Sequence, residues 1–247
     1  MATQEVEFAH VSFDLPGGRR LLDDISLKVA AGSTTALLGR SGSGKTTLLR
    51  TVNALVRPTG GKVLVGGQDV AQTDVIALRR GIGYVIQETG LFPNMSVGRN
   101  VGMALELAGR SVAERKAKSI EMLLLVGLAN DLLERYPWQL SGGQRQRVGL
   151  ARALAAEPAV LLMDEPFGAL DPLTRAEMQT MLKELLKRVG KTTLIVTHDL
   201  EEALYLADRV VLVADGRVVA DLAAAEVRGS ENEAVRAYVA ATHREPV

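Results

Sequence analysis

The feature that most constrains the fold of this 247-residue chain is a glycine-rich segment, Gly39–Thr46, with the sequence GRSGSGKT. A short apolar run, Thr34–Leu38, precedes it, and a stretch of helix-forming residues, Lys45–Leu55, follows it. This pattern marks a phosphate-binding loop when it lies between a strand and a helix, as it does here. The segment therefore predicts an α/β fold whose ligand site lies at the end of a buried strand.

Each residue type in this loop has a chemical reason to be there. Glycines let successive backbone N–H groups surround a phosphate, and the N-terminus of the following helix adds partial positive charge. Lys45 is expected to reach the β- and γ-phosphate oxygens, and the hydroxyl of Thr46 to bind Mg²⁺. The predicted site for a nucleoside triphosphate comprises Gly39, Ser41, Gly42, Ser43, Gly44, Lys45, Thr46 and Thr47.

Two acidic residues, Asp164 and Glu165, follow a second apolar run, Ala159–Met163. They are expected at the C-terminal end of a buried strand, where open α/β sheets bind their ligands. Asp164 is predicted to bind Mg²⁺ through water, and Glu165 to polarise the attacking water as a general base.

The rest of the chain has the pattern of a mainly parallel sheet with helices packed on it. Glu5–Phe8 and Ile25–Val29 predict an antiparallel edge, whereas the middle third of the chain is dominated by helix formers and indicates an inserted helical subdomain. The C-terminal third returns to alternating elements. These are a helix over Leu173–Val189, a strand over Thr193–Thr197 and a hairpin of Val210–Val213 with Arg217–Ala220.

The composition excludes several classes of protein. Lys and Arg total 29 and Asp and Glu total 29, so there is no basic excess for binding nucleic acid. Cysteine is absent, which excludes disulfides and thiolate metal sites. No apolar run approaches the roughly 20 residues of a membrane span, so any role at a membrane is expected to be peripheral.

Another glycine motif, Leu140-Ser141-Gly142-Gly143-Gln144, precedes a helix-compatible run, Arg145–Ala156. Ser141 and the two glycines would present unpaired N–H groups to an anion. With this motif the chain resembles the ATP-binding-cassette family over about residues 5 to 220. Gln87 resembles the glutamine loop of that family, Ala169-Leu170-Asp171 its D-loop and His198 its switch histidine.

The resemblance implies an ATPase with ATP and Mg²⁺ as cofactors. Residues 1–225 would form the ATPase domain, with a helical subdomain at about 88–156, and residues 226–247 a short C-terminal tail. Two copies would pair head to tail, so that Ser141, Gly142, Gly143, Gln144 and Asp171 of one chain complete the site of the other. Glu165, His198 and Gln87 would be catalytic, and Thr46, Gln87 and Asp164 would serve the metal.

Within this family, the single cassette and the absence of a coiled-coil insertion favour transport over DNA repair or translation. A cassette with no membrane span of its own resembles those of importers, in which the cassettes are separate subunits. This resemblance implies transmembrane permease subunits, a solute-binding protein and a place on the cytoplasmic face of the membrane. Stretches such as Tyr84–Val97 and Tyr136–Leu154 are similar to osmoprotectant cassettes for glycine betaine, choline or proline. The alternative is a non-transport nucleotide switch that regulates a partner complex.

Two positions stay open between alternatives. Cassettes stack the adenine on an aromatic residue, but the equivalent position here is Leu15, so Phe13 is the aromatic candidate. Leu91, Phe92 and Met95 follow the glutamine loop, where importer cassettes receive a coupling helix of the permease. These three side chains either line that groove or pack within the helical subdomain.

Overall fold

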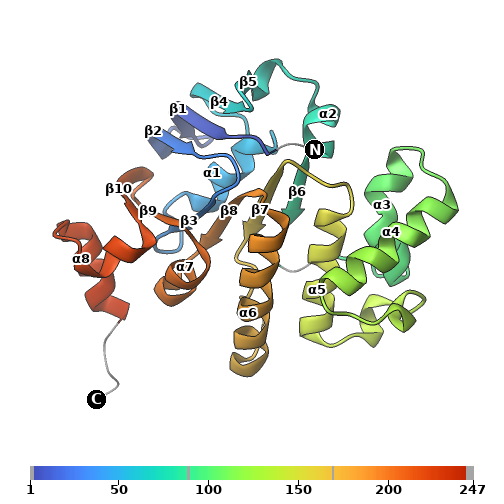
Figure 1. Cartoon of the computed structure of the whole chain (residues 1–247). Helices are drawn as coiled ribbons and strands as arrows, with labels where there is room; N and C mark the ends of the chain where they lie inside the picture. The colour runs from blue at the N-terminus through green and yellow to red at the C-terminus, as the bar shows by residue number, and fades with distance from the viewer. Residues whose placement is uncertain (1–2, 88–89, 169, 243–247) are drawn as a thin grey trace.

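The computed structural model describes residues 3–87, 90–168 and 170–242. Within these residues the strands form two sheets, stacked one above the other in Figure 1. The order is β2-β1-β4-β5 in the smaller sheet and β10-β9-β3-β8-β7-β6 in the larger. The predicted fold class, an α/β phosphate-loop core with an N-terminal antiparallel edge, is confirmed.

The smaller sheet is antiparallel; short turns connect β1 to β2 and β4 to β5, and β4 returns after β3 and α1 to pair with β1. Phe8 pairs with Leu27 on one side and with Val63 on the other, and Gly66-Gly67 closes the hairpin from β4 to β5. Its strands are β1 (Val6–Asp14), β2 (Arg20–Val29), β4 (Gly60–Val65) and β5 (Gln68–Asp69).

The larger sheet is parallel from β9 to β6, and only β10 is antiparallel to its neighbour. Strand β3 lies between β8 and β9, and every residue of β3, β7 and β8 is buried, as expected for a parallel sheet covered on both faces. Its strands are β3 (Thr34–Leu38), β6 (Ile82–Val85), β7 (Val160–Asp164), β8 (Thr192–Thr197), β9 (Arg209–Ala214) and β10 (Arg217–Ala223).

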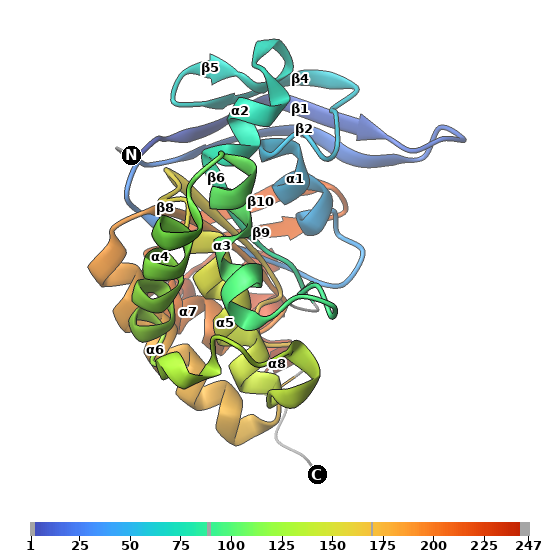
Figure 2. The same cartoon turned by 90° about the vertical axis from the view of Figure 1, so that its right-hand side faces the viewer.

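Helices cover the larger sheet in separate layers. Helix α1 packs between the two sheets, where Leu48, Leu49 and Val52 are buried. Figure 2 shows α3, α4 and α5 gathered on one side of the molecule. The α-helices are α1 (Lys45–Val52), α2 (Val75–Arg80), α3 (Val97–Leu107), α4 (Val112–Leu125), α5 (Gly142–Leu154), α6 (Pro172–Val189), α7 (Leu200–Leu206) and α8 (Glu233–Thr242).

Short 3₁₀ turns connect several of these elements. They are η1 (Val70–Gln72), η2 (Asn130–Leu132), η3 (Pro137–Gln139) and η4 (Ala224–Gly229). The helices α3, α4 and α5 fall within the predicted subdomain of 88–156, whose boundaries remain a prediction. Residues 88 and 89 lie outside the described residues. None of the described helices has both the length and the apolar character needed to cross a membrane.

The structure corrects two helix boundaries expected from the sequence and adds elements that were not predicted. The helix after the phosphate loop ends at Val52, not at Leu55, and Gly60-Gly61 begins β4 because pairing with β1 supplies backbone hydrogen bonds. Helix α5 begins at Gly142, three residues before the predicted start, since Ser141 caps it. Helix α2, which Asp74 caps, was not predicted.

Candidate nucleotide site

The glycine loop connects β3 to α1, as predicted, and its conformation explains the glycines. Gly39, Gly42 and Gly44 have φ angles of 155°, 80° and 100°. A Cβ atom on Gly39 would lie 2.2 Å from the carbonyl oxygen of Val213 on the adjacent strand. Glycine is therefore required at this position, where the loop backbone passes close to the adjacent strand and takes a φ that residues with side chains avoid.

Lys45 begins α1 and is 4% exposed. Its Nζ donates hydrogen bonds to the carbonyl oxygens of Gly39 and Arg40, both at 2.8 Å, so the ammonium is held over the loop. Burial lowers the pKa of Lys45, while the negative charges of Glu165 and Asp164 oppose that shift. A partly desolvated cation at this place interacts strongly with phosphate oxygens.

Thr46 and Asp164 are 118 residues apart in sequence and adjacent in the fold. The hydroxyl of Thr46 donates a hydrogen bond of 2.7 Å to Oδ1 of Asp164, which is 2% exposed at the end of β7. A hydroxyl and a carboxylate oxygen are ligands of the kind that Mg²⁺ takes, with water and phosphate oxygens completing its octahedron. These residues fit a magnesium ion.

Arg50 and Tyr84 also hold Asp164, and sequence reasoning did not identify either of them. The Arg50 guanidinium and the Tyr84 hydroxyl each donate to Oδ2 of Asp164 at 3.3 Å. Burial raises the pKa of Tyr84, which keeps the hydroxyl protonated as a donor. No short motif marks these two residues, because they come from α1 and β6 and meet Asp164 only in the folded sheet.

Glu165 lies directly after β7 with a φ of 44°, a conformation uncommon for a residue with a side chain. One carboxylate oxygen lies 3.4 Å from Nε2 of Gln87, and the other lies 3.4 Å from Nδ1 of His198. The structure thus brings together the three residues predicted to be catalytic. Backbone strain of this kind occurs at sites where a side chain must point in a fixed direction.

These side chains and the loop line one open pocket of about 620 Å³, the size of a small-molecule site. Leu21 and Tyr238 also line it and were not predicted. The lining residues are Leu21, Arg40, Ser41, Gly42, Ser43, Gly44, Lys45, Thr46, Thr47, Gln87, Glu165, His198 and Tyr238.

The glycine motif at Ser141 lies at the start of α5, outside the described lining of this pocket. The Ser141 hydroxyl accepts a hydrogen bond from the backbone N–H of Gln144, and the Gln144 side chain accepts one from the N–H of Ser141. The other N–H groups of the first turn have no partner within the helix. The start of α5 is therefore a second helix N-terminus, separate from that of α1.

A family model described as "ABC transporter" matches residues 22–168. The chain belongs to the ABC transporter family. The "Glycine betaine/carnitine/choline transport ATP-binding protein OpuCA" of Bacillus subtilis (strain 168) is 42% identical over 95% of this chain and 62% of its own length. A "Sulfate/thiosulfate import ATP-binding protein CysA" of Mesorhizobium japonicum is 51% identical over 80% of the chain and 57% of its own length.

A solved dimeric ATP-binding cassette in a post-hydrolysis state, bound to ADP and Pi, superposes with a TM-score of 0.79 at 32% identity. The superposition covers 89% of this chain and 98% of the solved cassette chain. The chain spans about half the length of the first curated relatives it matches, 54% to 55%.

The predicted D-loop, Ala169-Leu170-Asp171, lies just before α6 in the sequence. Asp171 caps α6, with its carboxylate accepting from the backbone N–H of Thr174 at 3.0 Å. Hydrogen bonds from the side chain and backbone of Thr174 hold the pKa of Asp171 below its ordinary value. Ala169 of the predicted D-loop lies outside the described residues.

The structure does not bring Phe13 into the nucleotide pocket of this cassette. Phe13 lies in β1, paired with Leu22, and its ring packs partly buried against the core between the sheets. Leu15 lies in the turn from β1 to β2, where its N–H donates to the carbonyl oxygen of Arg19. Leu21, near the start of β2 and just after this turn, is an apolar residue that does line the pocket.

Proposed function

We propose that this chain is the ATP-hydrolysing subunit of a solute importer, working as a pair of cassettes on a separate membrane permease. The observation that carries the proposal is the carboxylate of Glu165, positioned between Gln87 and His198 and facing the phosphate loop. A binding module needs the loop alone, whereas a carboxylate in this position supplies a base for water.

In this proposal each residue has one task. Lys45 and the loop N–H groups hold the phosphates, and Thr46 with Asp164 holds magnesium, which neutralises charge on the phosphate oxygens when bound. Glu165 accepts a proton from the attacking water, and His198 and Gln87 orient that carboxylate. In this proposal Glu165 is the base for the nucleotide bound by its own chain, because it lines the same pocket as Lys45 and the phosphate loop.

The second half of the site comes from another copy of the chain. Ser141, Gly142, Gly143 and Gln144 lie outside the described pocket lining, and they form a helix N-terminus suited to a phosphate. The similar ADP-bound cassette is described as dimeric, which supports pairing of two cassettes, and the head-to-tail orientation is part of this proposal. Asp171, at the start of α6, would lie at the same interface.

The substrate class we infer is a quaternary amine or another small polar osmolyte. Support comes from relatives whose names specify glycine betaine, carnitine or choline transport, although a sulfate/thiosulfate relative has a higher identity, 51% against 42%, over a shorter stretch of the chain. The partners would be permease subunits and a solute-binding protein, with the cassette peripheral on the cytoplasmic face. The test is to purify the tagged full chain from its native membrane and to measure ATP-dependent glycine betaine uptake in proteoliposomes. Co-purification of a soluble complex without a multi-span protein would instead favour a nucleotide switch.

The docking surface for the permease would include Phe92, whose side chain is 44% exposed. Asn100, buried on α3, fixes the loop before it: its side chain accepts from the N–H of Phe92 and donates to the carbonyl oxygens of Phe92, Met95 and Ser96. Leu91 packs against the helical core instead. A rigid loop with one protruding aromatic ring suits an anchor at an interface.

Phe92→Glu is expected to reduce transport at least tenfold while ATP hydrolysis by the purified cassette stays within twofold, because the charge disrupts an apolar contact far from the phosphates. Uptake and phosphate release are measured in parallel. Leu107→Glu serves as the control, since Leu107 is 71% exposed at the end of α3. Equal transport in Phe92→Glu and wild type would exclude this contact.

Phe13→Ala tests the base end of the site. Stacking on Phe13 predicts that the substitution weakens ATP binding by roughly 5- to 150-fold, the worth of one base–aromatic contact. If the ring of Phe13 only packs between the sheets, Phe13→Ala lowers the melting temperature and leaves the affinities for ATP and GTP unchanged. Titrations with both nucleotides, alongside thermal unfolding, separate the two results, and Leu15→Ala is the matched comparison.

A further inference from the structure

Helix α8, the last helix of the chain, packs beside the β9–β10 hairpin (Figure 1) and contacts the start of α7. Val235 of α8 is buried in one apolar cluster with Leu200 of α7 and Val227 of η4, and Val239 packs partly buried against it. The family model ends at residue 168, far before this helix. Residues 233–242 are therefore a docked element whose position is fixed relative to the nucleotide pocket.

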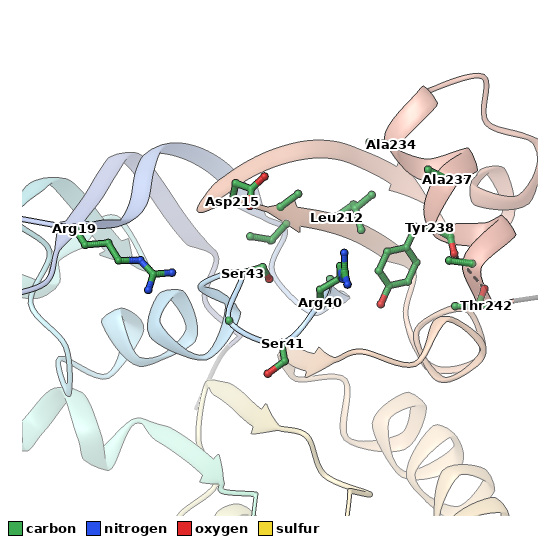
Figure 3. A pocket seen from close by; sticks show the side chains of 15 residues that line it. Arg19, Arg40, Ser41, Ser43, Leu212, Asp215, Ala234, Ala237, Tyr238 and Thr242 are labelled. Carbon is green, nitrogen blue, oxygen red and sulfur yellow. Dashed lines mark hydrogen bonds between the residues drawn. The ribbon is translucent and has the colours of Figure 1, made fainter.

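Tyr238 connects this helix to the proposed catalytic residues. Its hydroxyl donates a hydrogen bond of 2.7 Å to the backbone carbonyl oxygen of His198. The side chain lines the nucleotide pocket and also an adjoining cavity of about 880 Å³, in which Figure 3 shows the ring reaching from α8 toward Arg40 and Ser41. Burial, together with the charge of Asp199, raises the pKa of Tyr238, so the hydroxyl remains a donor at neutral pH.

His198 lies at a junction between two elements, where a single hydrogen bond to its backbone can set the position of its side chain. It lies between the end of β8 and the start of α7, and its side chain is 62% exposed, so little packing holds the ring. The ring nevertheless lies 3.4 Å from the carboxylate of Glu165. The C=O of His198 and the N–H of Asp199 belong to one planar peptide group, and this N–H donates to the Thr197 hydroxyl at 3.0 Å. The Tyr238 hydroxyl holds the carbonyl end of the same peptide group.

We propose that Tyr238 is a positioning residue, which holds the main chain of His198 so that its ring faces Glu165 and makes α8 part of the hydrolytic site. The inference rests on the proposed function, in which His198 orients the base. A hydroxyl that only docked the helix would affect stability and leave the histidine ring where it is. A positioning hydroxyl affects turnover and the ring's environment together, because displacement of a catalytic group by a fraction of an ångström slows the chemical step.

The test is Tyr238→Phe in the full chain, which removes the hydroxyl and keeps the ring. We expect kcat for ATP to fall roughly 3- to 10-fold, the worth of one neutral hydrogen bond, with KM within twofold. The chain has three histidines, so ¹⁵N-histidine spectra have few ring signals, and His198→Ala identifies the one that belongs to His198. That signal should shift in Tyr238→Phe, while the signal of His10 stays in place.

Tyr205→Phe is the matched control, because Tyr205 lies on α7 with its ring against Lys183 and away from the pocket lining. It should leave both kcat and the His198 signal unchanged. An unchanged kcat in Tyr238→Phe, or an unchanged His198 signal, would overturn the inference, whatever the melting temperature does. Absence of ATP hydrolysis in the wild type, or full turnover in His198→Ala, would contradict the proposed function instead and remove the basis of the inference with it.

Discussion

Glu165→Gln is expected to bind ATP with near-normal affinity and to hydrolyse it about 10²- to 10⁴-fold more slowly. The amide keeps the shape of the side chain, so its place between Gln87 and His198 is retained, but it cannot accept a proton from water. Lys45, Thr46 and Asp164, which we propose hold the phosphates and the metal, are unchanged. Phosphate release and equilibrium nucleotide binding, measured on the same preparation, separate the two effects.

The control is Glu184→Gln, the same chemical change on the exposed side of α6. It should hydrolyse ATP at the wild-type rate. A further consequence is that Glu165→Gln accumulates as an ATP-bound dimer, detectable by size-exclusion chromatography, because closure no longer leads to cleavage. Near-normal turnover in Glu165→Gln would show that another group is the base.

Ser141→Arg is expected to lower ATP turnover roughly 100-fold, the effect of losing donors aimed at developing charge, while each chain still binds nucleotide. Ser141 caps α5, and its exposed position leaves room for a second chain's phosphate. A long side chain there blocks the approach of the partner's nucleotide. The measurement is the ATPase rate against protein concentration, since dimer formation makes the rate per chain rise with concentration in the wild type.

Two comparisons isolate the role of the partner chain. Ser111 caps α4 with the same reciprocal pair of hydrogen bonds, through Glu114, so Ser111→Arg removes an equivalent cap away from the site. Ser111→Arg should lose about 1 kcal/mol of stability and keep its turnover. Mixing Lys45→Ala with Ser141→Arg chains should restore activity, because a mixed head-to-tail dimer has one intact site. No restoration would place Ser141 in its own chain's site or outside the mechanism.

The sequence by itself determined those parts of the protein that depend on neighbours along the chain. The loop Gly39–Thr46 was predicted with its strand and helix because glycines, lysine and threonine act there within a few residues of one another. Strand β3 was predicted with its observed bounds, since a short, largely apolar run that leads into a glycine loop is typical of a strand in a sheet covered on both faces. The parallel core followed from alternating strands and helices.

Only the tertiary structure decided which distant residues meet, because contacts across more than a hundred residues depend on strand order, which no local pattern encodes. The order β3-β8-β7-β6 brings Thr46 to Asp164 and adds Arg50 and Tyr84 around that carboxylate. It likewise decided that Phe13 packs in the core between the sheets. Burial of one apolar face of α8 placed Tyr238 beside His198, and no motif in the last residues of the chain indicated it.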